Sequence, residues 1–212
     1  MSKFPTNILE EPAKVDGNTL ANLGPLTGMA GIWEGRKGVD VNPQDGASEK
    51  KPYLEHYELQ PIDPQTNGPQ LFYGLRYHTF IMEPRKKETY HDQLGYWLWE
   101  PATGSILHTL AIPRGQIAMA TGTASPDATS FELVAKRGEL SNGIISNPFL
   151  EHAFTTVAWH MKVSINADGT WSYDQDTHIK VKGQRKLFHH TDRNTLTKIG
   201  EPTPNLLARK KK

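Results

Sequence analysis

The sequence predicts an all-β fold, an antiparallel up-and-down barrel of about ten strands. Apolar and polar residues alternate with period two in segments such as 51–59 and 70–80, the pattern of half-buried strands. The segments end at hairpin turn signals such as Ala167-Asp168-Gly169. Parallel strands would need long crossover connections, usually helices, and the chain has none between these segments. Consecutive antiparallel hairpins therefore predict a barrel that can enclose one small ligand.

The elements follow in chain order. Residues 1–26 contain one helical candidate, around Thr19 to Leu23, in a stretch broken by proline and glycine, and we expect an N-terminal arm or lid. A barrel domain is expected over residues 27–200 and a basic tail over 201–212. The predicted strands cover residues 31–35, 51–59, 70–80, 90–99, 105–113, 116–122, 130–135, 153–165, 170–180 and 187–199.

Alternation assigns the inward face of some strands. In segment 170–180, Trp171 and Tyr173 share one face, which we expect to point inward, while Asp176 and His178 share the other. His178 is therefore predicted to lie in solvent beside Asp176. In segment 90–99 both faces become apolar toward the end, so the pattern leaves the inward face there open.

Composition excludes several classes of function. The 212 residues carry 24 Lys+Arg against 23 Asp+Glu, a net charge of +1, so no general electrostatic attraction for nucleic acid is expected. Cysteine is absent, which excludes disulfides, thiol catalysis and thiolate metal ligation. No secretory signal pattern and no apolar stretch long enough to span a membrane occur, so we expect a soluble, cytoplasmic protein without membrane contact.

Histidine is the remaining residue type with ligand chemistry, and the chain has nine. Neither a His-x-His nor a His-Glu-x-x-His zinc pattern is present. His189 and His190 are adjacent in the predicted last strand, so one points inward and the other outward. A single inward imidazole in an apolar, aromatic-lined cavity meets the need of a haem iron for a proximal ligand. The pattern leaves open which of the two it is.

Several motifs together resemble the nitrobindin-like haem-binding β-barrel family, once described as fatty-acid-binding-protein-like, with a lipocalin-like barrel. These motifs are Gly31-Ile32-Trp33-Glu34-Gly35, Tyr53-Leu54-Glu55, the run from Leu94 to Gly104, and a histidine shortly before Leu196-Thr197-Lys198-Ile199. The resemblance covers roughly residues 27–199. It implies a ten-stranded antiparallel barrel in which a histidine of the last strand holds ferric haem b at one mouth. It also implies binding of nitric oxide and isomerisation of peroxynitrite to nitrate.

Residue by residue, the resemblance implies that His190 is the axial ligand of the haem iron, or His189 if the register is slipped by one. The residues predicted at the haem site are His190, His189, Trp33, Gly35, Ser48 and Arg76. One departure concerns the family pattern Gly-x-Trp-x-Gly-x-Gly. Lys37 stands at its last position, and Gly38 follows one place later.

Two function classes remain open. In the first, the iron carries out the chemistry and the chain is a haem-dependent peroxynitrite isomerase that needs no protein acid or base. In the second, the barrel is a non-catalytic carrier of a fatty-acid-like or other apolar small molecule, with Arg76 pairing to its carboxylate. Both place a small-molecule ligand in the barrel. The sequence leaves the oligomeric state open, with a homodimer as one alternative.

Overall fold

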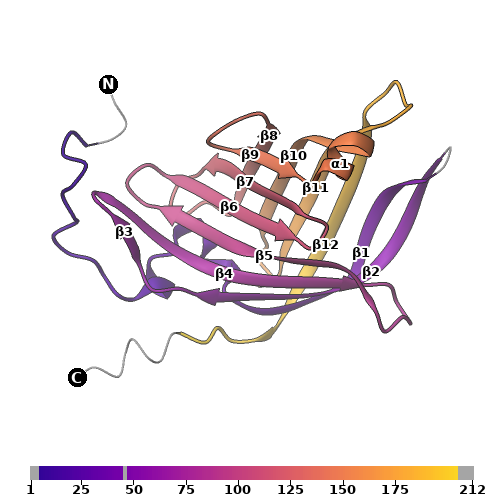
Figure 1. The fold of residues 1–212 in the computed structure, drawn as a ribbon. Helices are drawn as coiled ribbons and strands as arrows, with labels where there is room; N and C mark the ends of the chain where they lie inside the picture. The colour runs from indigo at the N-terminus through magenta and orange to yellow at the C-terminus, as the bar shows by residue number, and fades with distance from the viewer. Residues whose placement is uncertain (1–4, 45–46, 205–212) are drawn as a thin grey trace.

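The computed structural model describes residues 5–44 and 47–204 and shows a β-sheet closed into a barrel (Figure 1). The strands are β1 (Gly31–Gln44), β2 (Ala47–Pro61), β3 (Gln65–Asn67), β4 (Gln70–Met82), β5 (Thr89–Glu100), β6 (Ser105–Ile112), β7 (Gln116–Thr123), β8 (Ser130–Arg137), β9 (Gly143–Ser146), β10 (Phe154–Ile165), β11 (Trp171–Val181) and β12 (Phe188–Gly200). Three short helices are described: η1 (Thr19–Ala21) and η2 (Gly24–Met29), both 3-10, and α1 (Pro148–Ala153).

The strands close because the two ends of the sheet meet. Strand β1 pairs with both β2 and the last strand β12, and β2 pairs with β4, which completes the ring. Strand β3 pairs only with β4 and lies outside the ring. All described pairings are antiparallel except that of β8 with β9. The predicted antiparallel barrel is confirmed.

Eleven strands make up the ring, one more than the sequence pattern yielded. The additional strand is β9, which inserts between β8 and β7. Its four residues are too few for a period-two pattern to show. Its pairings with β7 and β8, rather than its local sequence, therefore define it as a strand.

Helices η1 and η2 bring an apolar group into the core at one end of the barrel. Leu23, Leu26 and Met29 are completely buried. The Trp33 indole Nε1 donates a hydrogen bond to the Met29 carbonyl oxygen at 2.8 Å. The Trp33 ring packs edge-on against the Trp171 ring. Trp33 thus lies inside the barrel as expected, with 1% of its surface exposed. None of the described helices has the length and apolar character needed to cross a membrane.

A β-bulge in β1 explains the imperfect glycine motif. Gly35 pairs with Glu55 and Gly38 pairs with Tyr53, so β1 uses one residue more than β2 over this stretch. The extra residue lets Lys37 lie exposed while Gly38 returns to the buried side. The glycine shifted in sequence therefore keeps an interior position.

In β11 the inward face is the one assigned from the sequence. In β5, where the pattern left the inward face open, the structure shows which residues point inward. Trp171 and Tyr173 are buried and Asp176 lies on the opposite face beside His178. In β5, Trp97 and Trp99 point into the core while Tyr96 is exposed. From residue 205 on, the predicted basic tail lies outside the described residues.

Candidate ligand site inside the barrel

A cavity of about 540 Å³ lies inside the barrel. Apolar side chains from β4, β6, β10 and β11 form much of its wall, among them Ile81, Leu110, Met161 and Ile179. Polar and charged groups also reach it: Asp40, Lys51, Glu55, Glu83, Tyr90, His91, Gln93, His108, Arg114, Gln116, Tyr173, Gln175, His190 and Asp192. A chamber that combines apolar walls with convergent polar groups is typical of a small-molecule site.

His190 lines this cavity, whereas His189 does not. Strand β12 places His190 opposite Thr177 of β11, which is buried, and His189 opposite His178 on the outer face. His189 is exposed and contacts Asp176 through Nδ1 at 2.8 Å. Because neighbouring residues of a strand face opposite ways, only His190 reaches the interior. The prediction that one of these two imidazoles points inward and the other outward is confirmed.

Two carboxylates surround the His190 imidazole. Its Nε2 lies 2.7 Å from Asp40 Oδ1 and 3.5 Å from Asp192 Oδ2. Asp40 comes from β1 and is buried, and Gln175 donates a hydrogen bond to Asp192 Oδ2 at 3.1 Å. The three groups form a partly buried cluster at the wall of the cavity.

Opposing effects set the proton affinity of this cluster. Burial lowers the pKa of His190, but the hydrogen bond to Asp40 and the charges of Asp192 and Asp40 outweigh it, so the pKa is raised above 6.5. Burial raises the pKa of Asp192, although the His190 charge acts in the other direction. A ligating nitrogen must carry no proton. A metal centre at His190 therefore competes with the proton that the imidazolium form holds on the ring nitrogen not engaged by Asp40.

Glu55 is a second buried acid beside the cavity, and its hydrogen bonds are complete. Its carboxylate accepts from Thr79 Oγ1 at 3.0 Å, from Tyr173 Oη at 2.9 Å and from Asn194 Nδ2 at 2.9 Å. Burial raises the pKa of the carboxyl against the lowering effect of these bonds. The donors come from β4, β11 and β12, so Glu55 links four strands and has a structural role.

His108 is the interior residue that the sequence interpretation missed. It is 1% exposed, stacks on the Trp97 ring at 3.9 Å between centroids, and neither ring nitrogen has a hydrogen-bond partner among the described residues. Burial lowers its pKa to about 3, so the imidazole is neutral. The signal was present in the sequence, because His108 shares the apolar face of β6 with Ile106 and Leu110, each two residues away.

Three other residues predicted at the site, Trp33, Gly35 and Arg76, do not line the cavity. Trp33 and Gly35 belong to the packed core of β1, and a Cβ at Gly35 would overlap Asn194. Arg76 is exposed on the outer face of β4, a position that does not fit the carboxylate contact predicted for it. The Ser48 side chain lies outside the described part of the chain. Lys51 and Arg114 are the cationic side chains that line the cavity.

Comparison with known proteins decides the family. A model of the THAP4-like, heme-binding beta-barrel domain matches residues 22–198. The chain belongs to this family. The match spans nearly the whole barrel and confirms the nitrobindin-like, haem-binding assignment that the motifs indicated. No curated protein matches.

Solved structures support the fold of this family member. The crystal structure of Rv2717c from M. tuberculosis aligns with a TM-score of 0.60 at 24% sequence identity, covering 86% of this chain and 98% of that one. A β-barrel-like protein of a domain of unknown function from Brucella abortus aligns with a TM-score of 0.24 at 7% identity, covering 80% and 97%. The first likeness shows a shared fold, and the second carries no argument.

The residues around the cavity fit a haem group. His190 is the inward imidazole of the last strand, and Asp40 is placed to accept a hydrogen bond from its ring. Metal-ligating histidines commonly have such a carboxylate partner, which fixes the ring and raises its basicity. The unpartnered His108 imidazole adds a polar group that no other part of the described protein satisfies. The site therefore offers one inward imidazole from the last strand and a second polar group in the same cavity.

Proposed function

We propose that this barrel binds haem b with His190 as the axial ligand and that the bound haem interacts with small oxidised nitrogen species. The observation that carries the proposal is the inward position of His190 in the cavity of a heme-binding beta-barrel domain. When bound, haem supplies a redox-active iron at which nitric oxide binds and peroxynitrite is isomerised to nitrate. The chain itself supplies the ligand, the walls and the polar contacts.

Asp40 orients the axial ligand. With Asp40 Oδ1 at 2.7 Å from Nε2, the imidazole ring is held in one direction, and the nitrogen not engaged by Asp40 is left for a metal centre. The Asn42 side-chain amide in turn donates to Asp40 Oδ2. Asp40 is thus held from both sides, which keeps His190 in place.

Lys51 and Arg114 fit the acidic substituents of a haem. Both cationic side chains line the cavity, and a cation beside a carboxylate forms a charge-assisted hydrogen bond. Lys51 is already paired with Glu49 at 3.1 Å, so Arg114 is the more available of the two. We infer that Arg114 contacts a propionate.

His108 offers a hydrogen bond to a ligand bound in the interior. Its imidazole is neutral and one ring nitrogen carries a proton. Trp97 and Trp159 surround it, so water is scarce around this group and a polar contact there is strong. His108 therefore serves to position a small oxidised nitrogen species without transferring a proton.

A haem titration tests the proposal. Wild-type protein should develop a Soret band on addition of haem, and His190→Ala should lose it or bind at least about tenfold more weakly, because the axial ligand is gone. His189→Ala is the matched control on the adjacent, outward position and should bind as the wild type does. Nitrate yield from peroxynitrite, measured with and without haem, then tests the chemistry.

Two results would overturn parts of this proposal. If haem causes no Soret shift in wild type, haem binding is refuted and the carrier of an apolar molecule is favoured. In that carrier, Arg114 rather than the exposed Arg76 would contact the carboxylate of the ligand. Loss of the shift only in His189→Ala would move the ligand to the outer face. A normal Soret shift with no nitrate formation would leave haem binding intact and refute the isomerase activity.

A further inference from the structure

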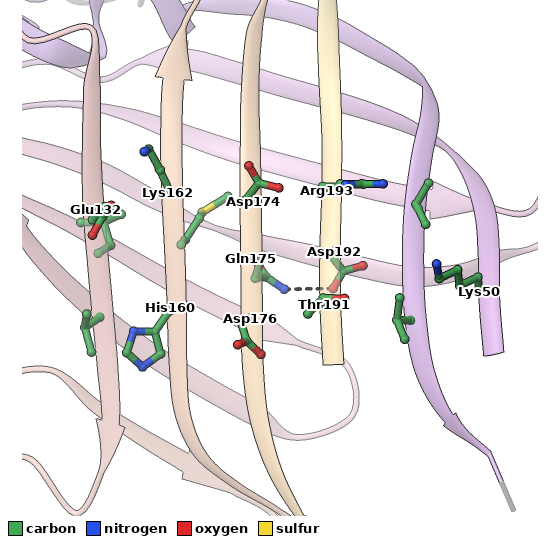
Figure 2. A pocket seen from close by; sticks show the side chains of 15 residues that line it. Lys50, Glu132, His160, Lys162, Asp174, Gln175, Asp176, Thr191, Asp192 and Arg193 are labelled. Atoms are coloured by element: carbon green, nitrogen blue, oxygen red, sulfur yellow. Dashed lines mark hydrogen bonds between the residues drawn. The ribbon is translucent and has the colours of Figure 1, made fainter. Parts of the chain in front are cut away.

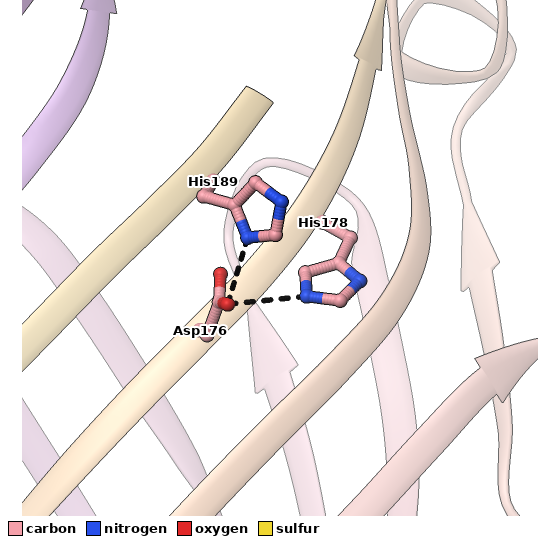
Figure 3. Close-up of side chains that lie close together, drawn as sticks. All are labelled: Asp176, His178 and His189. Carbon is pink, nitrogen blue, oxygen red and sulfur yellow. Dashed lines mark hydrogen bonds and ion pairs between the residues drawn. The ribbon is translucent and has the colours of Figure 1, made fainter. Parts of the chain in front are cut away.

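Asp176, His178 and His189 lie close together, with both imidazoles toward the carboxylate (Figure 3). They are on the outer face of the barrel, since none of them lines the cavity. Asp176 and His178 are two residues apart on β11 and therefore share its outward face. His189 on β12 is the direct cross-strand partner of His178. The hairpin between these strands brings the three side chains together.

Both imidazoles point at the same carboxylate oxygen. Asp176 Oδ2 lies 3.1 Å from His178 Nε2 and 2.8 Å from His189 Nδ1, and one ligand atom from each residue lies within 4.8 Å of the others. A tetrahedral zinc-type ion with bonds of about 2.0–2.1 Å holds its ligand atoms roughly 3.3 Å apart. A small opening of the cluster therefore makes room for an ion.

The second oxygen of Asp176 provides an independent indication. Asp176 Oδ1 is buried and has no hydrogen-bond partner among the described residues. A buried acceptor without a partner lowers stability. The two histidine contacts reach only Oδ2. A cation bound by both carboxylate oxygens would give Oδ1 the partner that it lacks.

We propose that Asp176, His178 and His189 form a binding site for a divalent transition-metal ion of the zinc class. Two imidazoles and one carboxylate suit zinc, nickel or copper better than magnesium or calcium, which prefer oxygen ligands alone. The His189 side chain is 55% exposed, so the fourth coordination position is open to water. Neutral imidazoles need only change tautomer to present the free nitrogen.

The surroundings leave this side of the barrel accessible. Asp176 also lines an outer-face hollow of about 730 Å³, together with His160, Lys162 and Arg193 (Figure 2). The His160 ring lies 5.0 Å from the His178 ring. An ion bound at the edge of this hollow is within reach of small solutes, and its binding does not depend on the haem site.

Calorimetric titration of Zn²⁺ into tag-free wild-type protein tests the site, with Co²⁺ absorption as a spectroscopic readout of the ligand field. We expect one ion per chain at the outer-face group. His178→Ala and His189→Ala should each weaken binding by at least about tenfold, since each removes a ligand. Asp176→Asn should do the same while keeping the side-chain shape. Far-UV circular dichroism of each variant, and His189→Gln as a second replacement, separate ligand loss from misfolding.

Two controls make the outcome specific. His78 is exposed and pairs with Asp92 at 3.2 Å, and it belongs to no three-ligand group among the described residues, so His78→Ala should bind Zn²⁺ as the wild type does. His190 belongs to a second group of possible ligands, with Asp40 and Asp192 inside the barrel. The titration is therefore repeated in His190→Ala, in which the ion at the outer-face group should remain. The proposal is overturned if wild type binds no Zn²⁺, if the His178 and His189 variants bind normally, or if only His190→Ala abolishes binding.

Discussion

His108 shows how a single buried imidazole couples the barrel to pH. Its pKa falls from 6.5 to about 3 on folding because burial disfavours the charged form. Between these values the unfolded chain binds a proton that the folded chain does not. Its contribution to stability is therefore complete above pH 6.5 and is lost as the pH falls toward 3.

The corresponding prediction concerns His108→Phe. The replacement keeps an aromatic ring on Trp97 and removes two unpaired nitrogens, so the free energy of unfolding at pH 7 should rise by about 1 kcal/mol or more. Between pH 7 and pH 5 the free energy of unfolding should fall by about 2 kcal/mol less in His108→Phe than in wild type. Urea unfolding at both pH values measures this. The exposed variant His78→Phe is the control, and an unchanged pH slope in His108→Phe would contradict the assignment.

At the scale of an element, the bulge in β1 depends on a residue without a side chain at position 38. A Cβ there would overlap the ring of Tyr53, which is buried and hydrogen-bonds through its hydroxyl to Tyr173 at 2.8 Å. Gly38 itself pairs with Tyr53 of β2, and the pairing of β1 with β12 resumes at the next residue, Val39, so the strand is held close to this contact. The glycine is required here by a close approach between two strands.

Gly38→Ala should therefore lower the free energy of unfolding by about 1–3 kcal/mol, the usual range for overpacking a filled interior. Gly17→Ala is the matched control, because nothing lies within 4 Å of a Cβ at Gly17. We expect it to change stability by less than about 0.5 kcal/mol. Thermal and urea unfolding of both variants measure the difference. Equal stability of the two would show that β1 and Tyr53 adjust at little cost.

At the scale of the whole molecule, Glu55 connects strands that are far apart in sequence. Its three donors lie on β4, β11 and β12, so the carboxylate stabilises the region where the first and last strands close the ring. Removing the shared acceptor lowers the stability of the barrel, because each of the three donors then stays buried without a partner.

Glu55→Ala should lower the free energy of unfolding by about 3 kcal/mol or more, since it leaves Thr79, Tyr173 and Asn194 without their shared acceptor. Tryptophan fluorescence and far-UV circular dichroism during urea unfolding measure the loss. Glu34→Ala, at a half-buried carboxylate paired with the exposed Arg36 on the same strand, should cost at most about 1 kcal/mol. A similar cost for both variants would show that the ring closes without the Glu55 network.

The sequence by itself determined the fold class and much of the inside–outside order. Period-two alternation depends only on neighbouring residues, because successive side chains of a strand point to opposite faces. This local rule predicted the inward Trp171 and the outward His178, and it required His189 and His190 to separate. The same rule places His108 inward and Arg76 outward, although the sequence analysis did not apply it to these two residues.

Only the tertiary structure decided what these residues meet. Asp40 and His190 are 150 positions apart and lie 2.7 Å from one another because β1 and β12 pair to close the barrel. Strand β9 exists through its pairings with β7 and β8, and the bulge moves Gly38 back to the interior. Likewise, the unpaired oxygen of Asp176 follows from packing around it. Contacts across the closed ring depend on register between distant strands, which no local pattern of residues specifies.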